Sequence, residues 1–190
     1  MRQWLTIVGA GLLGILAVAV LTLLALGLRP GAGTITGEAV IDRRPAEVWP
    51  WIVEGERLLE WVAWLTEVED LTPGVEGVGA GRRWVMIDPT MGDQRVEIVG
   101  EITDYEPERR STMSLESPGM FFGWGTYELV DLGDGRTRVE YVSEFSVHSW
   151  LGRLLEPLVT SQASAKAADD LARLKQRIEA APAGMATQSE

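Results

Sequence analysis

The single histidine of this 190-residue chain, His148, is its one candidate for acid–base chemistry near neutral pH. The chain contains no cysteine, so a thiolate nucleophile, a disulfide framework and a cysteine-ligated zinc site are excluded. Every Ser-His-Asp triad would have to use His148, and a metal site built from several histidines is excluded as well. A histidine beside Trp150 at an element boundary is also typical of a capping or packing residue. His148 is therefore a catalytic candidate with a simpler structural alternative.

Acidic side chains offer a second kind of chemistry. Glu54, Glu56 and Glu60 could pair with Asp88 or Asp93 to transfer protons or to hold a hard cation. No ligand-like spacing supports such a site, and a chain with 28 Asp and Glu residues places many carboxylates on its solvated surface. We therefore predict no metal site and no cofactor.

The charge balance of the chain excludes one class of partner. Its net charge is −11, with 17 Lys and Arg against 28 Asp and Glu. A surface this acidic repels phosphate groups, and the sequence has no basic run with interleaved aromatic residues. We expect no nucleic acid partner.

Residues 4–28 form a long, uncharged and mostly aliphatic segment. About 20 apolar residues are enough for a helix to cross the hydrocarbon core of a bilayer. The segment predicts a single-pass transmembrane anchor over residues 1–29, followed by a linker at 30–33. A cleaved signal peptide is the alternative, although its apolar region usually has only about 7–15 residues. The flanking charges leave the side of the membrane open, and the small pair Ala10 and Gly14 leaves a homodimer open.

The remaining sequence predicts an α+β domain over residues 34–180 and a disordered tail over 181–190. Turns containing glycine and proline separate runs in which apolar and polar residues alternate, which favours an antiparallel meander with one buried face. Pro45 and Glu47 have the types expected in the first turn of a helix. Strands are predicted at Thr34–Asp42, Trp64–Leu71, Arg82–Ile87, Gln94–Tyr105, Ser111–Glu116, Met120–Val130 and Thr137–Val147, and short helices at Pro45–Ile52 and Glu56–Trp61.

The last element is predicted to be a long amphipathic helix over residues 149–180. Pro157 lacks a backbone N–H, so we expect the helix to bend or break near Leu154. The polar face is expected to hold Asp169, Asp170, Arg173 and Lys175. The apolar stripe is expected to consist of Leu151, Leu154, Leu155, Leu158, Leu171, Leu174 and Ile178.

Four segments occur in the order found in a known superfamily. They are IDRRPAEVW (41–49), GVGAGRRW (77–84), GEITDYEPER (100–109) and GRTRVEY (135–141). Together they resemble the SRPBCC superfamily, the START-like and polyketide cyclase/dehydrase group. The resemblance implies the helix-grip fold, in which a curved seven-stranded antiparallel sheet wraps around the last helix and two short helices follow the first strand. It supplies no universal catalytic motif, and the iron-binding histidines of the oxygenase branch have no counterpart here.

The resemblance also implies an apolar cavity between the sheet and the long helix. The segment 121–125 has apolar neighbours that point to both faces of one strand, so it is expected at the wall or rim of this cavity. A rim of Met120, Phe121 and Phe122 could also dip into lipid. The residues expected to bind a ligand are Trp84, Met86, Met113, Trp124, Tyr127, Tyr141, Phe145, Leu155 and Leu158.

These features favour a membrane-anchored domain that binds a hydrophobic or amphipathic small molecule, with lipid among the candidates, and does not transform it. Two alternatives stay open. One is an enzyme of the polyketide cyclase/dehydrase type, which a polar pair pointing into the cavity would favour. The other is a structural or interaction domain, which a cavity too small for any ligand would favour.

Overall fold

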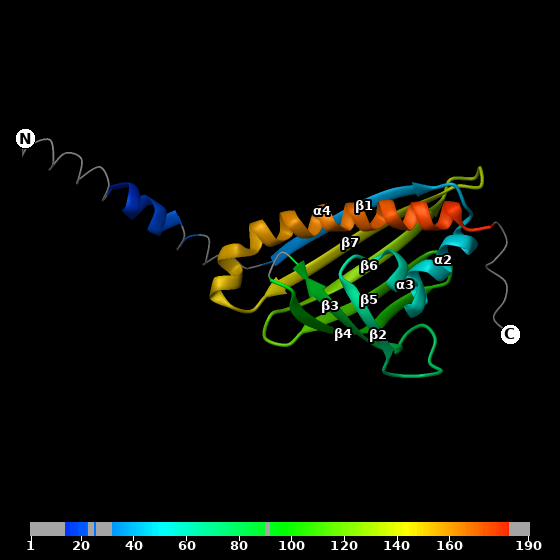
Figure 1. Cartoon of the computed structure of the whole chain (residues 1–190), viewed down its shortest axis with the longest axis horizontal. Coiled ribbons are helices and arrows are strands. Elements are labelled where there is room, and N and C mark those ends of the chain that lie inside the picture. Colours follow the sequence, from blue (N-terminus) through cyan, green and yellow to red (C-terminus); the bar gives the residue numbers. More distant parts are fainter. Residues whose placement is uncertain (1–13, 23–24, 26–31, 90–91, 183–190) are drawn as a thin grey trace, which may run out of the picture.

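Seven strands form one antiparallel sheet, and a long C-terminal helix lies across it (Figure 1). This computed structural model describes residues 14–22, 25, 32–89 and 92–182. The strands are β1 (Ala32–Ile41), β2 (Leu65–Asp70), β3 (Gly81–Asp88), β4 (Gln94–Glu106), β5 (Arg110–Ser117), β6 (Phe121–Asp131) and β7 (Thr137–Val147). The helices are α2 (Pro45–Val53), α3 (Gly55–Trp61) and α4 (Trp150–Ala180).

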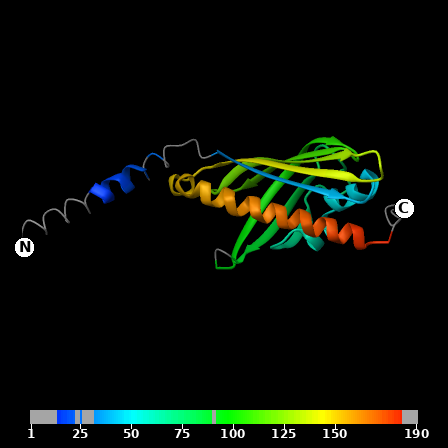
Figure 2. The ribbon, with the colours of Figure 1, turned by 90° about the horizontal axis from the view of Figure 1, so that it is seen from above.

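The arrangement is that of the helix-grip fold, as the sequence predicted. The strand order is β1-β7-β6-β5-β4-β3-β2, so α2 and α3 carry the chain from one edge of the sheet to the other. Helix α4 runs along the sheet and packs mainly against β1 (Figure 2). The predicted strands agree closely with the observed ones, except that β1 begins at Ala32 and includes the end of the predicted linker.

Local chemistry explains where α2 begins. Pro45 occupies the first helical position, where the missing N–H costs no hydrogen bond. The carboxylate of Glu47 accepts a hydrogen bond of 3.2 Å from the backbone N–H of Arg44, which precedes the helix. The helix ends where the N–H of Glu54 donates to the carbonyl of Pro50 at 2.9 Å, and α3 follows at once.

Helix α4 continues through Pro157 as one element, so of the predicted bend or break near Leu154 the break was wrong, and the bend stays a prediction. Its start is capped by Ser149, whose hydroxyl oxygen accepts a hydrogen bond of 2.9 Å from the N–H of Gly152. Beyond the proline, Leu171, Leu174 and Ile178 are almost completely buried. We attribute the continuity to this packing, because burying three large side chains outweighs the loss of one backbone hydrogen bond.

The hydrophobic core lies at the end of the sheet that α2 and the last turns of α4 cover. Trp61 anchors it, since its side chain is 2% exposed and its Nε1–H donates to the carbonyl of Trp51 at 2.8 Å. At the other end of α4, Leu155, Leu158 and Val159 are between 46% and 58% exposed, whereas Glu156 is 5% exposed. The large buried apolar side chains of α4 are therefore concentrated toward its C-terminal end.

Charged side chains near the end of α4 bind the last residues of β1 and the loop that follows it. The Nζ of Lys175 donates to the carbonyl of Val40 at 2.5 Å. A carboxylate oxygen of Glu179 accepts a hydrogen bond of 2.9 Å from the N–H of Asp42, and Arg43 donates to the carbonyl of Glu179 at 3.1 Å. These contacts hold α4 in place on the sheet.

Residues 14–22 are helical, and apolar side chains such as Ile15 and Leu21 are mostly exposed there. Within the described part of the chain, no helix combines the length and apolar character needed to cross a bilayer. Most of the predicted anchor at 4–28 lies outside the described residues, as do positions 183–190 of the predicted tail.

Candidate functional site

A cavity of about 400 Å³ lies between the sheet and α4. Sites for small molecules usually have volumes of about 300–1,000 Å³ and mostly apolar walls. The polar lining residues are Asp88, Tyr127, Tyr141, Ser143, Lys166 and Asp170. Most of the other side chains are apolar, and they come from α2, α3, α4 and every strand of the sheet. The cavity thus has the size and the walls of a site for a small hydrophobic molecule.

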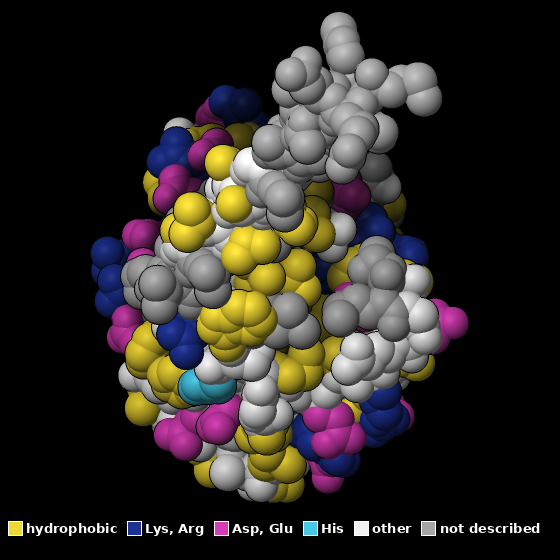
Figure 3. All heavy atoms as spheres, turned by 90° about the vertical axis from the view of Figure 1, so that its left-hand side faces the viewer, with side chains coloured by type: hydrophobic (Ala, Val, Ile, Leu, Met, Phe, Trp, Pro, Cys, Tyr) yellow, Lys and Arg dark blue, Asp and Glu magenta, His cyan; other side chains and the backbone are white. Residues whose placement is uncertain are grey.

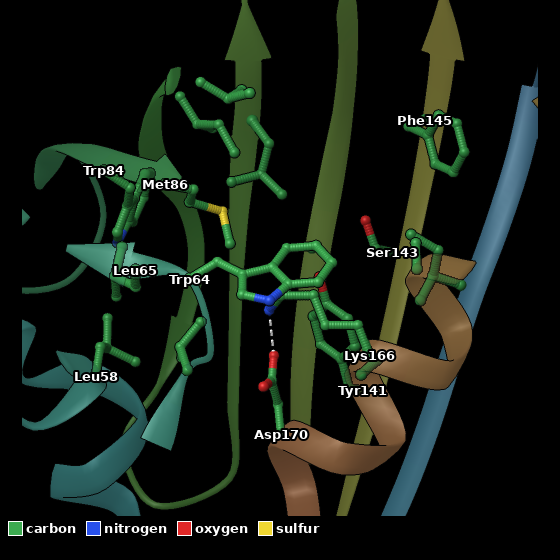
Figure 4. Close-up of a pocket in the computed structure, with 18 of the residues that line it drawn as sticks. Leu58, Trp64, Leu65, Trp84, Met86, Tyr141, Ser143, Phe145, Lys166 and Asp170 are labelled. Atoms are coloured by element: carbon green, nitrogen blue, oxygen red, sulfur yellow. Dashed lines mark hydrogen bonds and ion pairs between the residues drawn. The ribbon is translucent and has the colours of Figure 1, made fainter. Parts of the chain in front are cut away.

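The sheet wall follows from the alternation of side chains along each strand. On β7, Tyr141, Ser143 and Phe145 are two residues apart and all line the cavity (Figure 4). Trp84 and Met86 are related in the same way on β3. Six of the expected ligand-binding residues therefore line one space: Trp84, Met86, Met113, Tyr127, Tyr141 and Phe145.

Trp124 does not line the cavity, contrary to our expectation. Its side chain is 46% exposed and contacts Phe122, with ring centroids 4.7 Å apart. On β6 the inward positions belong to Phe121, Gly125 and Tyr127, so the alternation turns Trp124 to the opposite face. At Gly125 the strand carries no side chain, and the side chains of Leu115 and Tyr141 lie close to its backbone.

Leu155 and Leu158 were also expected to line the cavity and do not. The first lining residue on α4 is Val159, one turn after Leu155. Leu158 is rotated from Val159 by about 100° around the helix axis and is 58% exposed. The lining face of the helix instead consists of Val159, Ala163, Lys166, Ala167, Asp170 and Leu171.

His148 is exposed in the connection between β7 and α4 and does not line the cavity. Its backbone N–H donates to the carbonyl of Met120 at 3.2 Å, and its imidazole is visible on the surface in Figure 3. Glu54, Glu56 and Glu60 are exposed as well. Among the described residues no group of His, Cys, Asp or Glu could hold a metal ion.

The charged pair of Lys166 and Asp170 was missed as part of the site. The two side chains lie one turn apart on α4, and their ion pair is buried against the cavity (Figure 4). Asp170 also accepts a hydrogen bond of 2.9 Å from the N–H of Ala63 and pairs with Arg173. The spacing of Lys166 and Asp170 is the available sequence signal, but it is equally typical of an exposed helix face.

Burial and charge act on Lys166 in opposite directions. Burial lowers the pKa of its ammonium group below the ordinary value, and the carboxylate of Asp170 offsets only part of this effect. The Lys166 Nζ also lies 5.2 Å from the centroid of the Trp64 ring, a cation–π distance. Trp64 has a φ of 69°, which is rare for a bulky residue. The turn between α3 and β2 therefore holds an indole over the ammonium group in a strained backbone conformation.

Two phenol groups line the cavity near the same charged pair. The rings of Tyr127 and Tyr141 have centroids 4.6 Å apart. Burial raises the pKa of Tyr127 well above its ordinary value, and burial likewise raises that of Tyr141. Both side chains are therefore neutral hydroxyl groups that can donate a hydrogen bond to a ligand.

Comparisons with known proteins were consistent with this architecture. Among solved structures, TTHA0849 from Thermus thermophilus is 22% identical, with a TM-score of 0.64, and the match covers 76% of this chain and 96% of that one. The Zhui aromatase/cyclase from Streptomyces sp. R1128 is 15% identical, with a TM-score of 0.63 and coverage of 78% and 94%. Ara h 8.0201 is 12% identical, with a TM-score of 0.57 and coverage of 78% and 98%. Identities this low show the fold alone.

No curated protein matches the chain. A sequence model of the family described as "Polyketide cyclase / dehydrase and lipid transport" matches residues 32–179. The match runs from the first residue of β1 almost to the end of α4. The chain therefore belongs to the polyketide cyclase/dehydrase and lipid transport family.

Proposed function

We propose that this domain binds a hydrophobic or amphipathic small molecule in the cavity beneath α4, without transforming it. The observation that carries the proposal is an apolar cavity of about 400 Å³ between the sheet and α4. Apolar walls favour a ligand with a hydrocarbon or aromatic body. A volume of this size also argues against the alternative of a domain filled by its own side chains.

Filling the cavity tests this proposal. Ala163 lines the cavity on α4, so Ala163→Trp should occupy the space of the ligand. Ala168 lies on the same helix but is exposed, so Ala168→Trp is a matched control. We expect native mass spectrometry of the full chain to find a bound apolar molecule in the wild type and in Ala168→Trp, and not in Ala163→Trp. Absence of any ligand, together with no saturable binding of an environment-sensitive fatty-acid probe, would contradict the proposal.

We further propose that residues 4–28 anchor the chain in a membrane. Residues 14–22 of this segment form a helix with exposed apolar side chains, which favours an apolar environment over water. The side of the membrane on which the domain lies stays open. After an alkaline carbonate wash the full chain should stay in the membrane pellet. Recovery in the supernatant would contradict the anchor, and a mature chain that begins near Leu28 would favour the signal-peptide alternative.

The domain has an apolar end that fits such an anchor. Ala32, the first residue of β1, pairs with Ser146 near the end of β7, next to the start of α4. Four residues, 29–32, follow the predicted span and reach at most about 14 Å when extended. At this end Trp150, Leu155 and Leu158 are about half exposed, and hydrophobic side chains gather there in Figure 3. This end would therefore face the bilayer.

A membrane-facing end would also bring the cavity close to lipid. Met120 and Val159 line the cavity and are 37% and 46% exposed. Both residues are thus in contact with the cavity and with the surface of the domain. An apolar ligand could then pass from the bilayer into the cavity without crossing water.

A second candidate function is a polyketide cyclase/dehydrase-like activity. The observation that favours it is the Lys166–Asp170 pair, which points into an otherwise apolar cavity beside two tyrosine hydroxyl groups. An ammonium group can stabilise an enolate, and a carboxylate can accept a proton. The full chain would be incubated with a 3-hydroxydecanoyl thioester, which can lose water, and with a 3,5,7-trioxodecanoyl thioester, in which C2 can add to the C7 carbonyl to close a six-membered ring, and the products would be analysed by mass spectrometry. Loss of water or ring closure that Lys166→Met abolishes would support the enzyme, and an unchanged substrate would contradict it.

A further inference from the structure

The cavity contains a positive charge in an unusual setting. The side chain of Lys166 is 15% exposed and enters the cavity from α4, surrounded mainly by apolar walls. In Figure 4 it lies between the indole of Trp64 and the carboxylate of Asp170. The two lysines of the chain differ in this respect, because Lys175 is 41% exposed and its ammonium group bonds to the carbonyl of Val40.

The carboxylate of Asp170 is held without help from Lys166. One of its oxygens accepts from the N–H of Ala63 at 2.9 Å and pairs with Arg173. Arg173 in turn donates to the carbonyl of Trp61 at 3.0 Å. The carboxylate of Asp170 is thus shared between Arg173 and Lys166, and only its second oxygen pairs with Lys166. The acid and the guanidinium group form a structural unit that joins α4 to the end of α3.

The ammonium group of Lys166 can donate hydrogen bonds to a ligand. It carries three N–H donors, and among the described residues it donates a hydrogen bond to Asp170. Asp88, at the end of β3, also lines the cavity and attracts the ammonium group weakly. The Trp64 ring covers one side of Lys166 at 5.2 Å and offers no acceptor atom. An anionic group entering the cavity would meet a donor that these neighbours do not saturate.

We propose that the cavity selects amphipathic molecules with one anionic head group, a carboxylate or a phosphate monoester, which pairs with Lys166. The inference rests on the proposed ligand-binding function and adds the chemical class of the ligand. The apolar walls around Met113 and Phe145 receive the hydrocarbon body. A charge-assisted hydrogen bond in surroundings from which water is largely excluded gives this head group its advantage over a neutral one.

Ligands that differ in the head group alone test the proposal. The full chain in phosphatidylcholine nanodiscs would be titrated at pH 7 with octanoate, octyl phosphate and 1-octanol, with empty nanodiscs subtracted. We expect at least one of the two anions to bind the wild type about tenfold more tightly than the alcohol. Lys166→Met should lose this preference and keep its affinity for octanol. Lys175→Met is the matched control, because it removes the same charge outside the cavity and should keep the preference.

The possible results distinguish the proposed head-group preference from the proposed ligand-binding function. If the alcohol binds as tightly as both anions, or if Lys166→Met keeps the preference, the head-group inference is wrong and the binding function stands. If none of the three ligands binds, the binding function itself is contradicted. The arms with octanoate and octyl phosphate identify which anion is preferred. A thermal melt of Lys166→Met, with Lys166→Gln as a second variant, shows whether a loss of preference reflects binding or unfolding.

Discussion

The indole of Trp64 covers the ammonium group of Lys166, with Nζ 5.2 Å from the ring centroid, and Trp64 holds this position at a φ of 69°. A left-handed conformation in a bulky residue costs on the order of 1 kcal/mol, so other contacts of the turn must hold it. One such contact is the hydrogen bond of 2.8 Å from the N–H of Ile87 to the carbonyl of Trp64. The turn fixes one aromatic ring over one charge.

This relationship predicts a binding defect without a large loss of stability. Trp64→Gly relieves the backbone but uncovers Lys166, so the affinity for octanoate should fall by about 1 kcal/mol. Trp64→Phe keeps an aromatic ring, so its affinity for octanoate should fall by less. Titration of both variants, with thermal melts alongside, measures the two effects separately. Affinities for octanoate in both variants equal to that of the wild type would show that the ring has no role in binding.

The two halves of α4 should respond differently to the same substitution. Leu174 is completely buried, so Leu174→Ala should lower the free energy of unfolding by about 2–5 kcal/mol. Leu158 is 58% exposed, so Leu158→Ala should lower it by less than about 0.5 kcal/mol. Urea unfolding of both variants measures these values. A loss at Leu158 as large as that at Leu174 would mean that the start of α4 is packed as tightly as its end.

Asp170 should matter for stability as well as for the cavity. Asp170→Asn leaves Lys166 and Arg173 without their shared charge, and we expect a loss of about 2–4 kcal/mol in the free energy of unfolding. Adding Lys166→Met should restore part of it, because one unpaired cation is removed. Asp169→Asn, at the exposed neighbouring position, is the control and should have little effect. Chemical denaturation that finds Asp169→Asn and Asp170→Asn equally stable would refute the importance of this pairing.

The contact at the end of α4 should depend on pH. The hydrogen bond from the N–H of Asp42, together with Lys175, lowers the pKa of Glu179 below its ordinary value of 4.5. A carboxyl group with a lowered folded pKa stabilises the fold above the unfolded pKa, and that contribution disappears as the pH falls through the folded pKa. Wild type should exceed Glu179→Gln in stability by less than about 1 kcal/mol at pH 7. The difference should vanish at low pH, and a difference that grows on acidification would contradict this account.

The folded domain should not need the N-terminal segment. Among the described residues, the hydrophobic core and the side chains packed against it lie between Ala39 and Ala181, so a fragment of residues 32–182 should fold as a monomer and melt cooperatively. A fragment that ends before Leu171 should not, because it lacks the helix residues that complete the core. Circular dichroism of the two fragments tests the domain boundaries. A non-cooperative melt of the longer fragment would place the boundary elsewhere.

The sequence by itself determined the elements, their order and the inward face of the last strand. Alternation along a strand has a period of two, so Tyr141, Ser143 and Phe145 had to share a face. The same rule would have excluded Trp124, but Gly123 and Gly125 carry no side chains that reveal which face is inward. Local chemistry at Pro45 and the turns needed no tertiary information. These properties depend on neighbours in the chain, and the order of residues records them directly.

The tertiary structure decided which side of α4 meets the cavity. A helix presents residues in every direction, and its apolar stripe predicted correctly that Leu171, Leu174 and Ile178 are buried. Toward the start of the helix Leu155 and Leu158 are exposed, while Ala163 and Lys166 face the cavity. Lys166 and Asp170 have the types and spacing of a solvated pair, and only packing against Trp64 and Ala63 makes them part of a site. Burial of a charge depends on what lies opposite it in space, which a one-dimensional pattern does not contain.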